Sequence, residues 1–274
     1  MKSRQRSIAH TAQIGRLTIR STLTIAACLL VGAGTEAQPS PSGYLQPGAF
    51  DILLVLPPAP HAGDVRDNAD RALFRSTRKL RGTPRWDLAT NDVKLTPADM
   101  MRDFSCAAGI TLTPQRAPSV AALIARAAID TSRSSKNAKE YYHRNRPYLI
   151  DRGPICQPAE ELHGNEDYPS GHATLGWTWA TLLAELEPDH ATAILARGRA
   201  YGESRIVCGV HNASSVEAGR LTAAATLAAV QASPTFRTDF DAAKRELDAL
   251  RSAPDGPKPQ SCDSEAKLVA QPIL

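Results

Sequence analysis

Aromatic residues, cysteine and long apolar runs are all scarce in this chain of 274 residues. Aromatic side chains make up only 5% of it, so no aromatic stripe marks an interface, and the oligomeric state stays open. The sequence has no internal repeat and no alternating strand pattern, and runs rich in Val, Ile and Thr are rare. Beyond residue 37 no apolar stretch is long enough to cross a membrane. We therefore predict an all-α fold, a compact single-domain helical bundle without a stable membrane anchor.

The net charge of +4 is a property of the first 37 residues. Five basic residues precede the apolar residues 21–34, and Thr35-Glu36-Ala37 follows. This pattern predicts a secretory signal peptide over 1–37, because the apolar run is too short for the alternative, an anchoring helix. Without that segment 27 basic and 27 acidic residues remain, so charge gives no support for a nucleic-acid partner. The predicted location is the periplasm or the outside of the cell.

Only five cysteines are present, and Cys28 lies within the predicted signal peptide. An exported protein would keep Cys106, Cys156, Cys208 and Cys262, which predicts two disulfides with three possible pairings. No two of the four stand at ligand spacing and no histidine lies at a matching offset, so we predict no metal site.

Breaker residues divide the rest of the chain into predicted helices. A Pro/Ser-rich leader, 38–48, precedes a helical domain over 49–235, and 236–274 is expected to form a C-terminal helix and tail. The tail is expected to be a surface strap tied down by Cys262. Within the domain we predict helices over residues 64–80, 96–108, 119–145, 171–186 and 215–232, with 189–201 as a further candidate.

Three short segments carry basic and imidazole side chains in a fixed order. In the first, Lys139 and Arg146 are seven residues apart, so on one helix they would share a face about 10 Å apart along the axis. Two long cations on one face can converge on a single dianion. The second is Pro169-Ser170-Gly171-His172, where Ser170 is a natural N-cap and Gly171 permits close approach to the free N–H groups.

The remaining side chains supply chemistry. His172, in the first helical turn, could donate a proton to a leaving oxygen. Arg205 offers a charged fork for two phosphate oxygens, and His211 could attack phosphorus in line, with Gly209 in the loop between them. Each residue alone has an ordinary surface or capping explanation. Together, their order and spacing predict a phosphate site with two histidines.

On these residues the chain resembles the phosphatidic-acid-phosphatase type 2 and vanadium haloperoxidase superfamily, and within it the class A bacterial non-specific acid phosphatases. The superfamily pattern is Lys, six residues, Arg-Pro, then Pro-Ser-Gly-His, then Ser-Arg, five residues, His, three residues, Asp. Every position matches except the last. The class A likeness extends to 56–60, 104–107, 168–172 and 208–211 and covers roughly residues 45–235.

The resemblance implies the compact helical domain of this superfamily and a phosphomonoesterase that needs no metal and no cofactor. Its substrate would be a small phosphomonoester and its product inorganic phosphate. Carried over by position, His211 would be the nucleophile that forms phosphohistidine, and His172 would protonate the leaving alcohol and later activate water. The phosphate would be held by Lys139, Arg146, Ser170, Gly171 and Arg205.

The departure falls at residue 215, where the family Asp that supports the nucleophilic histidine is replaced by Ser215. A hydroxyl can fix the imidazole tautomer but cannot stabilise the developing cation, and analogous triad changes slow turnover about 10⁴-fold. We therefore expect weakened catalysis that Ser215→Asp would raise. Glu217 is poorly placed on a helix to replace the Asp, whereas Glu166 or Asp167 could supply a carboxylate from elsewhere.

Alternative functions remain open. A catalytically silent phosphate-binding protein would be protected by phosphate without turning substrate over. A vanadate-dependent peroxidase would oxidise bromide, and a lipid phosphatase is disfavoured by the lack of a membrane span. An acidic pH optimum is expected, since His172 must be protonated while His211 is neutral. The physiological phosphoester is not encoded in any of these motifs.

Overall fold

The computed structural model describes residues 42–253 and 258–274. The predicted signal peptide and residues 38–41 of the leader lie outside these ranges. The described residues form no β-strand, which agrees with the predicted all-α class. The helices are α1 (Val65–Thr77), α2 (Pro84–Asn91), α3 (Pro97–Ala108), α4 (Pro118–Tyr142), α5 (Pro147–Ile150), α6 (Gly171–Leu186), α7 (Ala191–Cys208), α8 (Ala213–Val230), α9 (Pro234–Ser252) and α10 (Cys262–Val269). Short 3₁₀ turns lie at Ile52–Leu54, Arg78–Leu80, Ala159–Leu162 and Pro188–His190.

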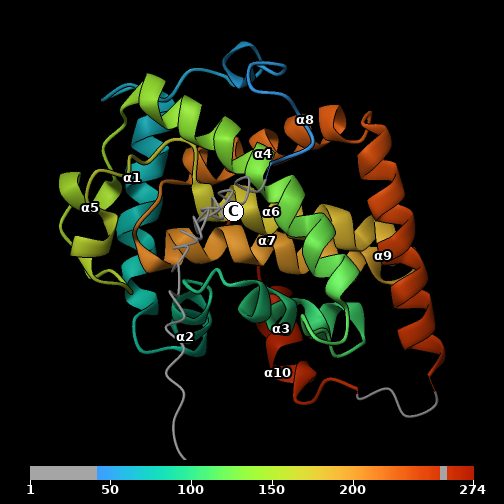
Figure 1. Ribbon diagram of the computed structural model, residues 1–274. Helices are drawn as coiled ribbons and strands as arrows, with labels where there is room; N and C mark the ends of the chain where they lie inside the picture. Colours follow the sequence, from blue (N-terminus) through green and yellow to red (C-terminus); the bar gives the residue numbers. More distant parts are fainter. Residues whose placement is uncertain (1–41, 254–257) are drawn as a thin grey trace, which may run out of the picture. The chain divides into compact units, whose positions relative to one another are not determined.

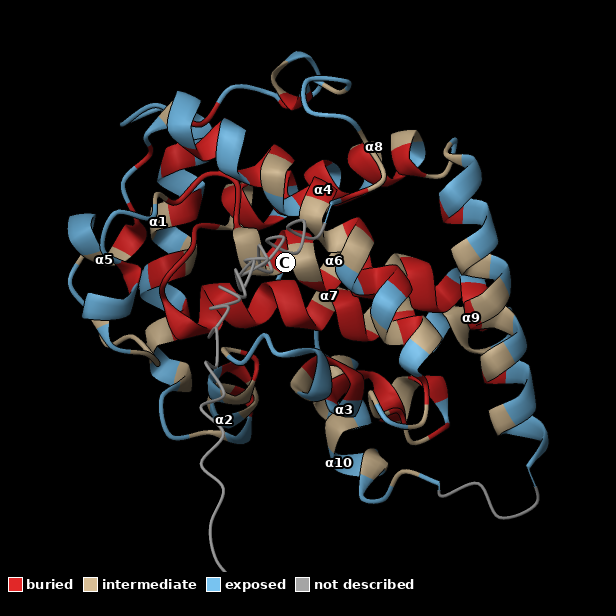
Figure 2. Ribbon diagram, viewed as in Figure 1, coloured by how far each residue is buried: buried red, intermediate tan, exposed pale blue. Residues whose placement is uncertain are grey.

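Helix α6 lies at the centre and packs against α4, α7 and α8 (Figure 1). Buried residues dominate α7 and the inner faces of α4, α6 and α8, while α9 exposes most of its outer face (Figure 2). Two glycines let α6 and α7 approach closely. A Cβ atom at Gly176 would lie 2.4 Å from the Tyr201 ring, and one at Gly198 would lie 2.3 Å from Ala180 Cβ. Larger side chains at either position would push the two helices apart.

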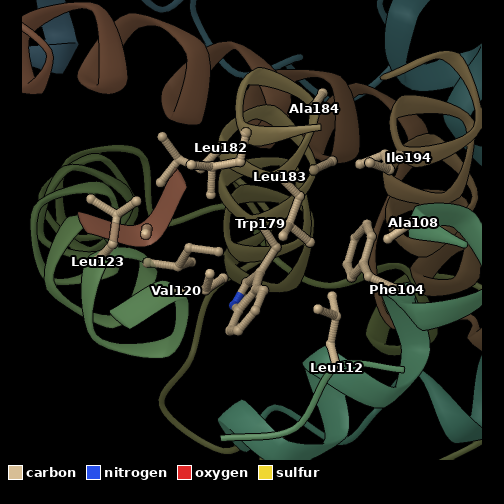
Figure 3. Packing of buried hydrophobic residues seen from close by; sticks show 14 of the residues in the cluster. Phe104, Ala108, Leu112, Val120, Leu123, Trp179, Leu182, Leu183, Ala184 and Ile194 are labelled. Atoms are coloured by element: carbon tan, nitrogen blue, oxygen red, sulfur yellow. The ribbon is translucent and has the colours of Figure 1, made fainter. Parts of the chain in front are cut away.

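The main hydrophobic core fills the space between α3, α4, α6 and α9. Trp179 of α6 packs in this cluster with Phe104 of α3 and Val120 of α4 (Figure 3). Phe236 and Leu247 of α9 belong to the same cluster. None of the helices in the described part of the chain is long and apolar enough to cross a membrane.

Several predicted helix boundaries are correct. The helix over 171–186 has the predicted bounds. Thr96 caps α3 by accepting a hydrogen bond from Asp99 N at 3.2 Å, with Pro97 in the first helical position as predicted. Helix α3 then ends at Gly109, whose φ of 66° is in the left-handed region that glycine tolerates.

Other boundaries differ from the prediction. Helix α4 ends at Tyr142 instead of 145, because His143 adopts a left-handed cap conformation with a φ of 46°. The next residue, Arg144, turns inward and forms ion pairs with α1. A helix that continued through residue 144 would lose these ion pairs. Helix α7 begins at Ala191 and extends to Cys208, seven residues beyond its predicted end, and the short helix α2 was not predicted at all.

Two disulfides select one of the three possible pairings. Cys156–Cys208 ties the loop after α5 to the end of α7. Cys106–Cys262 attaches α10 to α3, which agrees with the expected role of Cys262 in the tail. Backbone contacts also fix the tail, since Ile273 N donates to Glu203 Oε2 at 3.2 Å.

Candidate active site

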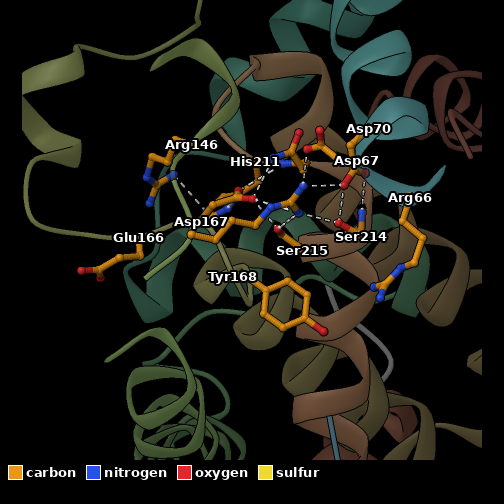
Figure 4. A network of polar contacts seen from close by, with 12 residues as sticks. Arg66, Asp67, Asp70, Arg146, Glu166, Asp167, Tyr168, His211, Ser214 and Ser215 are labelled. Atoms are coloured by element: carbon orange, nitrogen blue, oxygen red, sulfur yellow. Dashed lines mark hydrogen bonds and ion pairs between the residues drawn. The ribbon is translucent and has the colours of Figure 1, made fainter. Parts of the chain in front are cut away.

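The three predicted segments converge on the N-terminal end of α6. Lys139 comes from the last turn of α4, Arg205 from the last turn of α7, and His211 from the loop before α8. Arg146 lies in the loop after α4, at the N-cap of α5. Figure 4 shows part of the polar network around His211.

Arg146 reaches the site in a different way from that predicted. Helix α4 stops at Tyr142, so Lys139 and Arg146 do not share a helix face. Instead, two backbone carbonyls hold the Arg146 guanidinium: Nε donates to Asn165 O at 2.6 Å and Nη1 to Val210 O at 2.7 Å. The side chain is buried, and its positive charge lowers the pKa of Lys139.

His211 is held in one tautomer. Its Nε2 lies 3.1 Å from Arg146 Nη1 and its Nδ1 lies 2.9 Å from Asp167 Oδ1. Guanidinium groups only donate and carboxylates only accept, so Nδ1 carries the proton and Nε2 the lone pair. Burial, together with Arg146, Lys139 and Arg205, lowers the pKa of His211 well below its usual range despite Asp167. The residue is therefore a neutral imidazole whose Nε2 lone pair accepts from a cation.

Arg205 lies inside the last turn of α7, not in a loop as expected, and Gly209 caps that helix with a φ of 80°. The side chain is fully buried. Its Nη2 contacts the side-chain oxygen of Gln157, while Nε and Nη1 have no hydrogen-bond partner among the described residues. Burial lowers its pKa to about 10, so the group stays charged. A buried cation without a carboxylate partner is costly, and an anion would offset that cost.

Lys139 is also buried, and its Nζ contacts the backbone oxygen of Glu166. Burial and the charge of Arg146 lower its pKa to about 7. Lys139 therefore carries a full charge only in acidic solution, unlike the two arginines.

The start of α6 has the predicted capping geometry. Ser170 Oγ accepts a hydrogen bond from Ala173 N at 3.3 Å, and Ser170 N donates to Ser215 O at 2.8 Å. A Cβ atom at Gly219 would lie 2.6 Å from Ser170 O, so only glycine lets α8 approach this loop. Gly171 faces Lys139, because its own Cβ would lie 4.0 Å from Lys139 Cε. Free backbone N–H groups and a lysine thus meet at one helix end.

Ser135 of α4 also lies beside this helix end, and its buried Oγ has no hydrogen-bond partner in the described ranges. It lies as close to Gly171 as Lys139 does. A surface pocket lined by Ser135, Lys139, Asn165, Glu166 and Gly171 opens beside them. This pocket gives access to the helix end from outside.

His172 is the less constrained of the two histidines. Its Nε2 lies 3.1 Å from Val93 O, and since a carbonyl only accepts, Nε2 carries the proton and Nδ1 is left for proton transfer. Burial, followed by the charge of Arg205, lowers its pKa well below the usual range.

Of the two carboxylates that the sequence offered in place of the family Asp, Asp167 is the one beside His211. Asp167 contacts the ring directly, whereas the Glu166 carboxylate lies 3.6 Å from His143 Nδ1. Ser215 contacts Asp167. Arg144 and Gln157 were missed, and no spacing rule connects either of them to the motif.

No group of three or more potential metal-ligating side chains occurs in the part of the chain that the structure describes. The site is a cluster of buried cations around a neutral imidazole, an arrangement suited to a phosphate dianion.

Comparisons with known proteins show the family of this chain. Residues 118–239 match the PAP2 superfamily model. The chain is 40% identical over 238 residues to an acid phosphatase from Zymomonas mobilis, covering 86% of this chain and 89% of the relative. Non-specific acid phosphatases from Providencia stuartii and Salmonella typhimurium are 34% and 30% identical, over 74% and 84% of this chain and 83% and 94% of theirs. The protein belongs to the PAP2 superfamily. Within that superfamily, its relatives are the bacterial acid phosphatases.

Proposed function

We propose that the protein is an exported acid phosphatase that hydrolyses small phosphate monoesters through a phosphohistidine on His211, without metal or cofactor. The observation that carries the proposal is the fixed tautomer of His211, whose Nε2 lone pair faces Arg146. The unpaired donors of Arg205 and the names of the relatives support it.

Phosphate binding uses the cations and the helix end. Arg205 donates from Nε and Nη1 to two phosphate oxygens. Arg146 and Lys139 balance the remaining charge, and the Ser170 hydroxyl and the Gly171 backbone N–H approach a third oxygen. Taking up the dianion offsets the cost of burying these cations.

In the first chemical step, the His211 Nε2 lone pair attacks phosphorus opposite the ester oxygen. The bond from phosphorus to that oxygen breaks, and His172 gives its proton to the departing oxygen, so that the alcohol leaves neutral. For this step His172 must be protonated, and the negative charge of the bound ester favours its protonation.

In the second step, water attacks the phosphorus of phosphohistidine while His172 accepts its proton. The phosphorus–nitrogen bond breaks, its electron pair returns to Nε2, and inorganic phosphate is formed. His211 is then neutral again and ready for another ester.

Export is proposed from the first 37 residues and from the disulfides. The basic start, apolar stretch and Thr35-Glu36-Ala37 have the order of a signal peptide. Two disulfides are typical of proteins in oxidising compartments, so the periplasm or the outside of the cell is the proposed location.

The test is hydrolysis of para-nitrophenyl phosphate by the mature protein between about pH 4 and 8, with EDTA present. We expect EDTA-resistant turnover that His211→Ala abolishes, and an acid-labile phosphoenzyme in quenched wild type. Thermal protection by phosphate without any turnover would instead indicate a binding protein, and vanadate-dependent bromide oxidation a peroxidase.

A further inference from the structure

We propose that the carboxylate that positions the nucleophilic histidine has moved from residue 215 to Asp167, and that Ser215 now holds Asp167 in place. Asp167 is thus a positioning residue. The inference rests on the proposed function of His211, and it removes the reason to expect weak turnover.

Asp167 contacts His211 directly. Asp167 Oδ1 lies 2.9 Å from His211 Nδ1, the nitrogen that a supporting carboxylate must hold. Both residues are buried, so water does not compete for the contact. An ionised partner at this nitrogen can stabilise the positive charge that develops when Nε2 attacks phosphorus, which a serine hydroxyl cannot do.

Several donors hold the Asp167 carboxylate in place. Its Oδ1 also accepts from Asn212 N at 3.2 Å, and its Oδ2 accepts from Asn212 Nδ2 at 2.9 Å and from Ser215 Oγ. Arg144 Nη1 lies 3.4 Å from the same Oδ2. Both oxygens are occupied, so the carboxylate cannot rotate away from His211 without losing other bonds.

The backbone places Asp167 as firmly as its side chain does. Asp167 N donates to Arg144 O at 2.8 Å, and three residues later Ser170 N donates to Ser215 O at 2.8 Å. One loop therefore carries both the carboxylate for His211 and the cap of the phosphate-binding helix end. Residue 215 touches that loop with its side chain and its backbone.

A buried arginine offsets part of the negative charge. Arg144 Nη2 lies 2.9 Å from Asp70 Oδ2 and 3.4 Å from Asp67 Oδ1, and Nη1 donates to Ser214 Oγ at 2.6 Å. This network connects α1 to the start of α8 (Figure 4). It also explains why α4 ends early, since a helix continued through Arg144 would carry this side chain elsewhere.

These contacts reverse the expectation for Ser215→Asp. Ser215 Oγ donates to Asp167 Oδ2, and the side chain is fully buried. A second carboxylate there would meet the first at hydrogen-bond distance, and the like charges would raise the pKa of one of them and displace it. The substitution should therefore lower turnover.

The experiment is a residue exchange measured by steady-state kinetics with para-nitrophenyl phosphate. Asp167→Asn should lower kcat by about 10⁴-fold, as wrong-tautomer variants of other triads do, with a small effect on KM. Ser215→Asp alone should also lower kcat. Asp167→Ser combined with Ser215→Asp should regain at least about 100-fold over Asp167→Ser alone. Glu217→Gln, which removes an exposed carboxylate of the same helix, is the matched control and should leave kcat unchanged.

An independent readout is the tautomer of His211 in wild type, from ¹⁵N and proton NMR of labelled protein. Protonated Nδ1 in strong hydrogen-bond contact, lost in Asp167→Asn, supports the inference and does not require the variants to turn over. A protonated Nε2, a kcat within about threefold of wild type in Asp167→Asn, or a raised kcat in Ser215→Asp would each overturn it. Wild type that is inactive but has the expected tautomer would refute the proposed phosphatase function alone.

Discussion

Two arginines of α7, eight residues apart and both fully buried, have opposite surroundings. Arg197 is paired with Asp92 through two bonds, of 2.7 and 3.2 Å, and lies 3.0 Å from Glu265. Arg205 has no carboxylate partner and leaves Nε and Nη1 unpaired. Burial alone lowers the pKa of both, but the charge and hydrogen bonds of Asp92 raise that of Arg197, whereas that of Arg205 falls to about 10.

One helix therefore serves both as part of the scaffold and as part of the candidate site. A buried charge needs a partner, and the partner of Arg197 is in the chain, so its interactions are complete in the folded protein. Those of Arg205 are incomplete until an anion binds. Substitutions at the two positions should therefore separate stability from function.

The largest effect is expected at Arg205. Arg205→Met should lower kcat/KM for para-nitrophenyl phosphate by about 10³- to 10⁵-fold, since arginines that hold a transferring phosphoryl group contribute on that scale. The free energy of unfolding, measured in urea, should stay the same or rise, because an unpaired buried charge is removed. A large loss of stability with normal kinetics would mean that Arg205 is a structural residue like Arg197.

Arg197→Met should have the opposite outcome. It leaves Asp92 as an uncompensated buried charge and should cost about 3–5 kcal/mol of unfolding free energy, while the molecules that stay folded keep their kcat. Adding Asp92→Leu removes that charge too, and should recover part of the loss. If the double variant is no more stable than Arg197→Met, the ion pair is not the cause.

Sequence reasoning could not separate these arginines. The motif identified Arg205 by its spacing to His211, while Arg197 gave no signal because Asp92 lies 105 residues away in the sequence. The fold class, the start of α6 and the cap of α3 could be predicted because they depend on local sequence. The end of α4 and the partner of His211 depend on Arg144 and Asp167, whose contacts are formed between distant segments.

Added phosphate should affect the stability of the two arginine variants differently. At a concentration 100 times its dissociation constant, phosphate should raise the unfolding free energy of wild type by about 2.7 kcal/mol, because it binds only the folded state. The same concentration should protect Arg197→Met equally and Arg205→Met hardly at all. Differential scanning calorimetry with and without phosphate measures all three, and sodium chloride at equal ionic strength is the control for salt effects.

Lys139 is a third buried cation, and it can lose its proton where the arginines cannot. Its pKa is lowered to about 7, so above that pH the free enzyme loses one phosphate-binding charge. We expect kcat/KM to fall about tenfold per pH unit above pH 7, and this fall should begin at a higher pH in Lys139→Arg.

The stability of the folded protein should change in the opposite sense. Between pH 7 and the normal lysine pKa the unfolded chain binds the proton and the folded one does not, so the unfolding free energy should rise with pH. If the fall in kcat/KM stays at the same pH in Lys139→Arg, the titration of another group causes it. Measuring the pH profile of His172→Asn, and urea unfolding of wild type across the same pH range, would then separate the remaining candidates.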